Sequence, residues 1–287
     1  VMSEVPKKHQ QSLKIPKTIL VTAKFLEAMS SKLAVKFASK LFVTPIKYKL
    51  PKREIEMNLN SVQEKFTIQS IDKEIVVYKY GTESKKVLLV HGWSGRGTQL
   101  VKIADEMLKM GYSTISFDAP AHGKSAGKTS NMTDFIAAVM ELEEKHGPFE
   151  VAIGHSLGGM TILNAIKKGL KVKKAVVIGS GDIVKDIMDD FVEKLGMNIA
   201  ISKKIMASFE KKIGETMESF SAYIAAREIQ IPVLVIHDKD DEDVPVKAAH
   251  HIFENLKNGD LLLTGELGHR KILGDTKVIK KIVAFLK

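Results

Sequence analysis

One serine stands in a segment where it can act as a nucleophile. Residues 149–160 read FEVAIGHSLGGM, with Gly154-x-Ser156-x-Gly158 at the junction of a predicted strand and a predicted helix. The glycines allow a turn sharp enough to leave a serine hydroxyl exposed at the end of the strand. The first turn of the following helix offers free N–H groups and a dipole that favour negative charge. The pattern therefore predicts that Ser156 is a nucleophile.

A run of acidic side chains is the second candidate for chemistry. Residues 238–243 read DKDDED, so five of the six are acidic. The run can supply a catalytic carboxylate, hold a metal ion or simply be solvated. A calcium loop starting at Asp238 would need glycine where Asp243 stands and glutamate where Ala249 stands. The chain also has no H-E-x-x-H pair and no glycine-rich phosphate loop, so we expect no metal and no cofactor.

The elements that must position these residues follow a regular order from about residue 62. Strand patterns are expected at 64–70, 73–81, 86–92, 112–118, 149–155, 174–180, 232–238 and 260–265. Helical patterns separate most of them. This alternation predicts an α/β fold with a doubly wound, mostly parallel sheet and helices on both faces. Ligands of such sheets bind at the carboxyl ends of the strands, where both candidate segments fall.

The pattern divides the chain into three parts. Residues 62–181 and 228–287 form the predicted α/β core, and residues 1–61 form an arm that precedes it. Residues 182–227 interrupt the alternation with methionine and phenylalanine at helical spacing, which predicts a helical cap insertion over the carboxyl edge of the sheet. The apolar residues of the cap can line an adaptable substrate pocket or simply attach the cap to the body.

The positive charge of the chain is concentrated in the arm. Residues 1–53 hold eleven lysines and one arginine against two glutamates, a net charge of +10 that equals the net charge of the whole chain. The body is therefore neutral, which argues against a nucleic-acid partner. The absence of cysteine excludes disulfides and thiolate sites and fits a reducing compartment, so we expect a cytoplasmic protein.

The arm also has the pattern of an amphipathic helix. Apolar residues recur at three- and four-residue spacing, beside a face of lysines, at Leu26, Met29, Leu33, Phe37 and Leu41. Such a helix can pack its apolar face on the body, which is the simpler interpretation, or make a peripheral contact with an anionic membrane or a partner. Lysines interrupt every apolar run before the roughly 20 residues that a membrane-spanning helix needs.

Five segments, in this order, resemble motifs of the α/β-hydrolase family over about residues 62–287. They are VLLVHGWSGRG (a His-Gly motif after the third strand), SFDAPAHGKS (a D-x-P-G-x-G-x-S turn), AIGHSLGG (the nucleophile elbow), LVIHDKDDEDVP (an HG-x-x-D-x-x-VP loop) and GELGHRKIL (the loop of the final histidine). The resemblance implies the α/β-hydrolase fold and a Ser-His-Asp triad. It departs from the family pattern at Ala121 and at Asp238, where the family usually has glycine.

A serine nucleophile needs a base, and the base needs an acid that fixes its tautomer. In this family the acid and then the histidine follow the serine in the chain. Of the three histidines after the acidic run, His250 and His251 lie in a predicted helix, whereas His269 follows the last predicted strand. We therefore predict His269 as the base.

The spacing to Val244-Pro245 selects Asp241 as the acid, and Asp240 is a close competitor because a shift of one residue exchanges them. The other acidic residues of the run, Asp238, Glu242 and Asp243, are expected to be solvated.

The resemblance also implies an oxyanion hole formed by the backbone N–H groups of Trp93 and Leu157. Together these residues predict a serine hydrolase that cleaves a carboxylic ester or thioester with an apolar group through an acyl-enzyme. Two alternatives remain open: an acyltransferase with the same triad, and a non-catalytic protein that works through its basic arm. The oligomeric state does not follow from the sequence.

Overall fold

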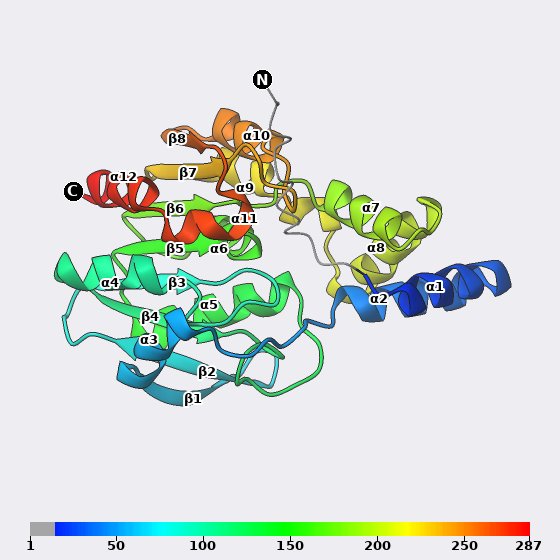
Figure 1. Cartoon of the computed structure of the whole chain (residues 1–287), viewed down its shortest axis with the longest axis horizontal. Coiled ribbons are helices and arrows are strands. Elements are labelled where there is room, and N and C mark those ends of the chain that lie inside the picture. The colour runs from blue at the N-terminus through cyan, green and yellow to red at the C-terminus, as the bar shows by residue number, and fades with distance from the viewer. Residues whose placement is uncertain (1–14) are drawn as a thin grey trace, which may run out of the picture.

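The computed structural model describes residues 15–287 and contains one eight-stranded sheet (Figure 1). The strands are β1 (Val62–Ile68), β2 (Lys73–Tyr80), β3 (Lys86–Val90), β4 (Ser113–Asp118), β5 (Val151–His155), β6 (Lys174–Ile178), β7 (Val233–Asp238) and β8 (Gly259–Thr264). Their order in the sheet is β1-β2-β4-β3-β5-β6-β7-β8. β1 and β2 run antiparallel to their neighbours, and all other pairs are parallel. The predicted doubly wound, mostly parallel α/β fold is confirmed.

Helices cover both faces of the sheet. The α-helices are α1 (Lys17–Met29), α2 (Ser31–Phe42), α3 (Ile55–Asn60), α4 (Val101–Lys109), α5 (Met132–His146), α6 (Leu157–Lys167), α7 (Val184–Lys194), α8 (Ala200–Ile213), α9 (Ala222–Glu228), α10 (Lys247–Asn255), α11 (Gly268–Lys271) and α12 (Thr276–Leu286). Short 3₁₀ helices are η1 (Lys52–Glu54), η2 (Met217–Phe220) and η3 (Ile272–Gly274).

Two apolar clusters, one on each face, hold this layered core together. Helices α5, α6, α9 and α10 pack on one face, where Phe135 and Ile252 are fully buried. Helices α4 and α12 pack on the other, where Met107 and Ile282 are fully buried. Because β3, β5, β6 and β7 have apolar residues on both faces, their sequences read as continuous apolar runs.

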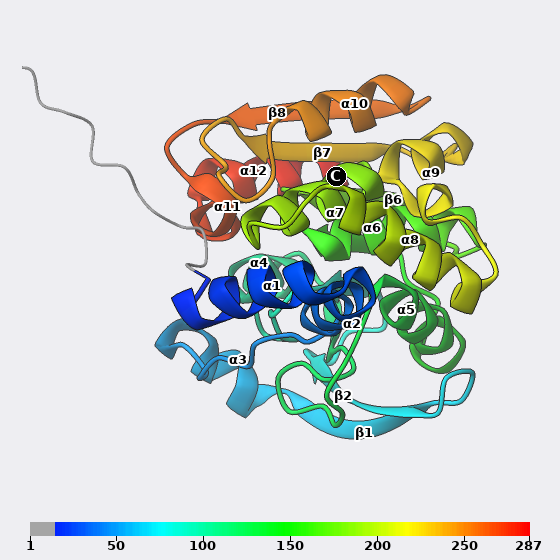
Figure 2. The same cartoon turned by 90° about the vertical axis from the view of Figure 1, so that its right-hand side faces the viewer.

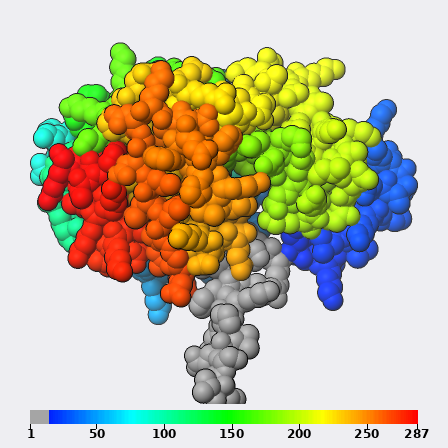
Figure 3. Space-filling view, turned by 90° about the horizontal axis from the view of Figure 1, so that it is seen from above, coloured from blue at the N-terminus to red at the C-terminus, as the bar shows by residue number. Residues whose placement is uncertain are grey.

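A third cluster joins the arm to the segment predicted as the cap, which in the structure holds α7 and α8 between β6 and β7. The cap helices α7 and α8 pack against α2, with Met188 and Ile205 fully buried and the rings of Phe42 and Phe191 5.1 Å apart. Figure 2 shows α1, α2, α7 and α8 together at the edge of the sheet where the parallel strands end, and Figure 3 shows the cap lying against the arm in space-filling form. No helix within residues 15–287 is long and apolar enough to cross a membrane.

The arm forms two helices where the sequence predicts one. The chain is extended at Ser30, with φ −164° and ψ 127°, and the Ser30 side chain accepts a hydrogen bond from the N–H of Lys32. Serine is a favoured N-cap, so it starts a new helix in the middle of the apolar repeat. The predicted apolar stripe is divided as a result: Phe37 packs on the cap, whereas Met29 is exposed. Residues 1–14 of the predicted arm lie outside the described residues.

Candidate active site

Ser156 sits on a strained turn between β5 and α6. Its backbone has φ 54° and ψ −119°, a conformation that non-glycine residues rarely adopt. A Cβ atom at Gly154 would lie 2.3 Å from the carbonyl oxygen of Gly158, and one at Gly158 would lie 2.2 Å from that of Val90. Neither position accepts a side chain, so both glycines are needed for this turn.

His269 and Asp241 meet at the same edge of the sheet. His269 lies in α11, just after β8, and Asp241 lies in the loop after β7. Nδ1 of His269 is 2.7 Å from Oδ2 of Asp241, and both residues are buried. The other carboxylate oxygen of Asp241 accepts hydrogen bonds from the N–H groups of Asp243 and Val244, which fixes its orientation. A proton held on Nδ1 by the carboxylate leaves Nε2 of His269 free to accept another.

The structure separates the two competing aspartates. Oδ2 of Asp240 accepts a hydrogen bond of 2.7 Å from the N–H of Glu266 and contacts the start of the His269 loop, whereas Asp241 contacts the imidazole itself. His251, which the sequence places in a helix, lies in α10 and pairs with Asp182 instead of Asp241, with 2.5 Å between Nδ1 and Oδ2.

The expectation that Asp238 is solvated is wrong. Asp238 is fully buried and accepts hydrogen bonds from the hydroxyl of Thr264 and the N–H groups of Leu267 and Gly268. These donors lie on both sides of the tight turn at Glu266, which has φ 65°. The carboxylate at the position of the family's glycine therefore fastens the loop that carries His269.

Burial alone would raise the pKa of Asp238, but these hydrogen bonds outweigh it, so its pKa is lower than the ordinary value of 3.8. A carboxyl with a depressed folded pKa stabilises the fold fully above its ordinary pKa and loses this contribution as the pH falls through the folded value.

We expect Asp238→Asn to lower the free energy of unfolding by about 1–3 kcal/mol at pH 7. The difference from wild type should shrink as the pH is lowered from 7 toward 3, as measured by urea unfolding. Glu242→Gln, at an exposed position in the same loop, is the control and should change little. A difference that stays constant over this pH range would contradict the assigned role of the carboxylate.

His155, which precedes Ser156, contacts His269 directly. Nε2 of His155 donates to the carbonyl oxygen of His269 over 2.8 Å, and the two rings are 4.6 Å apart. Burial holds the pKa of His155 well below its usual value, so this imidazole is neutral. Gly179, at the end of β6, closes the opposite side, since a Cβ there would lie 3.3 Å from Nδ1 of His269.

The predicted oxyanion donors border the serine on two sides. Leu157 is the first residue of α6, and the first N–H groups of a helix have no acceptor within it. Trp93 follows Gly92, whose backbone is so close to the serine that a Cβ at Gly92 would lie 2.9 Å from Cβ of Ser156. The Trp93 ring packs edge-on against His122, with 5.0 Å between the ring centroids.

The arm is tied to the loop of Trp93 by contacts that the sequence did not reveal. The N–H of Ile46 donates to the hydroxyl of Ser94 over 2.9 Å. Glu54, almost fully buried, accepts a hydrogen bond of 2.8 Å from the hydroxyl of Thr98 and lies 3.7 Å from Nε of Arg96. In the sequence Glu54 stands among other charged residues (KREIE), a local pattern that does not indicate a buried carboxylate.

The sequence matches known proteins in its central part. Residues 87–209 match the model of the Alpha/beta hydrolase family. The uncharacterized protein YqkD of Bacillus subtilis is 22% identical over 198 residues, which cover 63% of each chain. The match therefore spans less than two thirds of that relative.

Solved structures resemble the fold over most of the chain. An esterase of Pyrococcus furiosus superposes with a TM-score of 0.63 at 18% identity, covering 85% of this chain and 96% of its own. A putative lipase of Acinetobacter baumannii gives 0.62 at 18% identity, with 83% and 97% covered. A bromoperoxidase of Bacillus anthracis gives 0.60 at 17% identity, with 78% and 99% covered. The resemblance seen in the sequence is thus confirmed at the level of the fold, and this chain is an α/β-hydrolase-fold protein.

Proposed function

We propose that this protein is a serine hydrolase that cleaves a carboxylic ester or thioester through an acyl-enzyme intermediate. The observation that carries the proposal is the 2.7 Å hydrogen bond between His269 and Asp241, beside a serine on a strained turn. The family match and the neighbours described as an esterase and a lipase support hydrolase activity in general.

In this mechanism Oγ of Ser156 attacks the carbonyl carbon of the substrate, and Nε2 of His269 accepts the hydroxyl proton. The carbonyl oxygen becomes an oxyanion that accepts hydrogen bonds from the N–H groups of Trp93 and Leu157. His269 then gives its proton to the departing alcohol or thiol. A water molecule, deprotonated by the same imidazole, attacks the acyl carbon, and the imidazolium returns the proton to Oγ of Ser156 as the acid is released.

Asp241 keeps the Nδ1 proton of His269 in place and stabilises the imidazolium that forms in each half-reaction. Within residues 15–287 no hydrogen bond joins Ser156 to His269. The hydrogen bond between a nucleophile and its base commonly shortens when substrate binds.

The proposal is tested with a fluorophosphonate probe and a short-chain p-nitrophenyl ester. We expect the folded protein to turn over the ester and to take up one probe molecule, which mass spectrometry of the peptides locates at Ser156. Protein unfolded in urea before labelling should take up none, because reactivity depends on the assembled site. A folded protein that is inert toward both reagents, or labelled at another serine, would refute the proposed function.

A further inference from the structure

Helix α1 presents large apolar side chains to solvent. Val21, Phe25 and Met29 are 68%, 61% and 62% exposed and follow one another at four-residue spacing, so they line one face of the helix. Leu33, in the first turn of α2, is 42% exposed. Contiguous exposed side chains of this size mark a surface that contacts something apolar.

Exposed lysines lie on the same two helices as this apolar stripe and Leu33. Helices α1 and α2 carry five of them, at Lys17, Lys24, Lys32, Lys36 and Lys40. Their one acidic residue, Glu27, is turned toward the cap, where it accepts a hydrogen bond from the N–H of Asn198. The exposed side of α1 and α2 is therefore apolar and cationic, and the single carboxylate of these two helices is engaged elsewhere.

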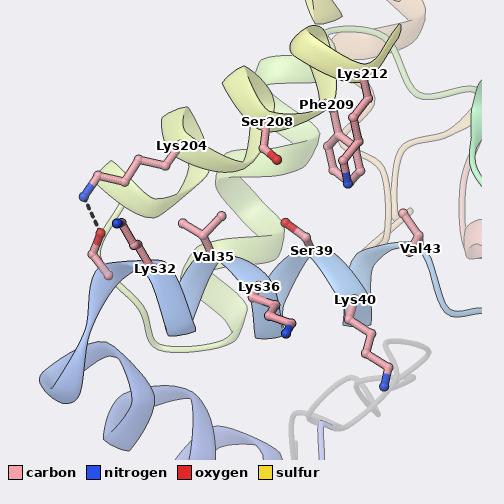
Figure 4. A pocket seen from close by; sticks show the side chains of 11 residues that line it. Lys32, Val35, Lys36, Ser39, Lys40, Val43, Lys204, Ser208, Phe209 and Lys212 are labelled. Carbon is pink, nitrogen blue, oxygen red and sulfur yellow. Dashed lines mark hydrogen bonds between the residues drawn. The ribbon is translucent and has the colours of Figure 1, made fainter.

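A groove of about 540 Å³ lies between α2 and α8, and several more lysines line it. Its lining combines lysines, serines and a few apolar residues: Ser31, Lys32, Val35, Lys36, Ser39, Lys40, Val43, Lys204, Ser208, Phe209 and Lys212. Figure 4 shows Ser39 and Ser208 facing one another across the groove, while Lys36 and Lys40 project from α2 on the side away from α8. Oγ of Ser39 is buried and has no partner among the described residues. Hydroxyl and ammonium groups of Ser39, Lys32 and Lys212 along one groove suit a phosphate group.

We propose that α1, α2 and α8 form a docking surface for an anionic lipid bilayer. The stripe of α1 enters the boundary between headgroups and acyl chains, and the lysines of α2 and α8 bind lipid phosphate. A bilayer is the occupant that uses both an apolar stripe and lysines, since a soluble anion has no use for the apolar stripe and a nucleic acid has little. The proposal goes beyond hydrolysis and does not depend on it.

The position of the docking surface gives it a consequence for the proposed reaction. Figures 1 and 2 show α1, α2 and α8 at the edge where the parallel strands end, which is the edge that carries Ser156. A protein bound through this surface holds its candidate active site close to the bilayer.

Flotation with vesicles tests the proposal on the full chain. Vesicles of phosphatidylcholine alone are compared with vesicles of phosphatidylcholine and phosphatidylglycerol at three to one. We expect binding to the anionic vesicles, weakened about tenfold or more by V21S/F25S/M29S and about a hundredfold by K36E/K40E/K204E/K212E. Ser156→Ala should bind like wild type, so loss of the hydrolase proposal leaves this test intact.

Two matched variants control for general effects of exposure and charge. Leu59 and Val62 are 74% and 63% exposed but lie outside the surface, so L59S/V62S should bind like wild type. K171E/K257E/K277E/K280E makes the same change in net charge at exposed positions of the core and should retain most of the binding. Equal binding to neutral and anionic vesicles, no binding to either, or an equal loss in the control variants would overturn the proposal. So would an unchanged V21S/F25S/M29S variant together with inhibition by inorganic phosphate, which would indicate a site for a soluble anion.

Discussion

Ser156→Ala is expected to lower kcat for a p-nitrophenyl ester by about 10⁴- to 10⁶-fold, because the alanine has no oxygen that can form the acyl-enzyme. The remaining rate would come from the oxyanion donors and from substrate binding alone. KM should change little, since the hydroxyl contributes mainly to the transition state. Steady-state kinetics at saturating substrate measures the effect.

The substitution leaves the fold in place. The turn already accommodates a Cβ at φ 54°, so alanine fits there. The hydrogen bond from the N–H of Ser156 to the carbonyl oxygen of Ile178 involves backbone atoms only and is kept in the variant. We therefore expect a midpoint of thermal unfolding close to that of wild type. Ser70→Ala, at an exposed position between β1 and β2, serves as the control and should keep full activity. An S156A variant that retains more than about a tenth of the wild-type kcat would eliminate Ser156 as the nucleophile.

Asp241→Asn should lower kcat by about 10⁴-fold, whereas Asp240→Asn should change it by less than about tenfold. An amide at position 241 can donate to Nδ1 of His269, which moves the imidazole proton to Nε2 and blocks acceptance of the serine proton. At position 240 the amide oxygen can still accept the N–H of Glu266, so the loop keeps its hydrogen bond. The two carboxylates are adjacent in the chain, but only that of Asp241 contacts the imidazole of His269.

Parallel kinetics of the two variants at pH 7 decide between the carboxylates. Both variants should unfold cooperatively in urea, which separates a change in chemistry from a loss of fold. If D240N loses more turnover than D241N, the assignment of the acid is reversed.

The positions of Ser156 and His269 in the fold were predictable because each residue lies in a short local pattern. Ser156 lies between Gly154 and Gly158, and both glycines are needed for a sharp turn at the serine. His269 follows a strand closely, in a loop that resembles the histidine loop of the α/β-hydrolase family. Asp238 was not predictable in the same way, because its partners Leu267 and Gly268 lie about thirty residues away in the chain. Local charge patterns suggest solvation, and only the tertiary fold shows that the carboxylate is enclosed by N–H groups.

The arm shows the same limit at the level of whole elements. The three- and four-residue repeat of apolar residues across residue 30 predicts one helix. In the structure Ser30 is the N-cap of a second helix, because its side chain accepts a hydrogen bond from the backbone and so favours a helix start over continuation of the first helix. The packing of α2 on the cap depends on side chains such as Phe191, about 150 residues further along the chain, which periodicity alone does not identify.

The contacts of Ile46 and Glu54 make the arm more than a removable tether. Without it, the hydroxyl of Thr98 and the guanidinium of Arg96 lose their buried carboxylate, and Ser94 loses the N–H that holds it beside Trp93. Unpaired buried groups of this kind cost about 1–3 kcal/mol each, and they would fall on the loop that carries a proposed oxyanion donor. The smallest unit that keeps this loop in shape therefore begins before residue 46, and a version shortened beyond residue 54 needs another acid in the place of Glu54.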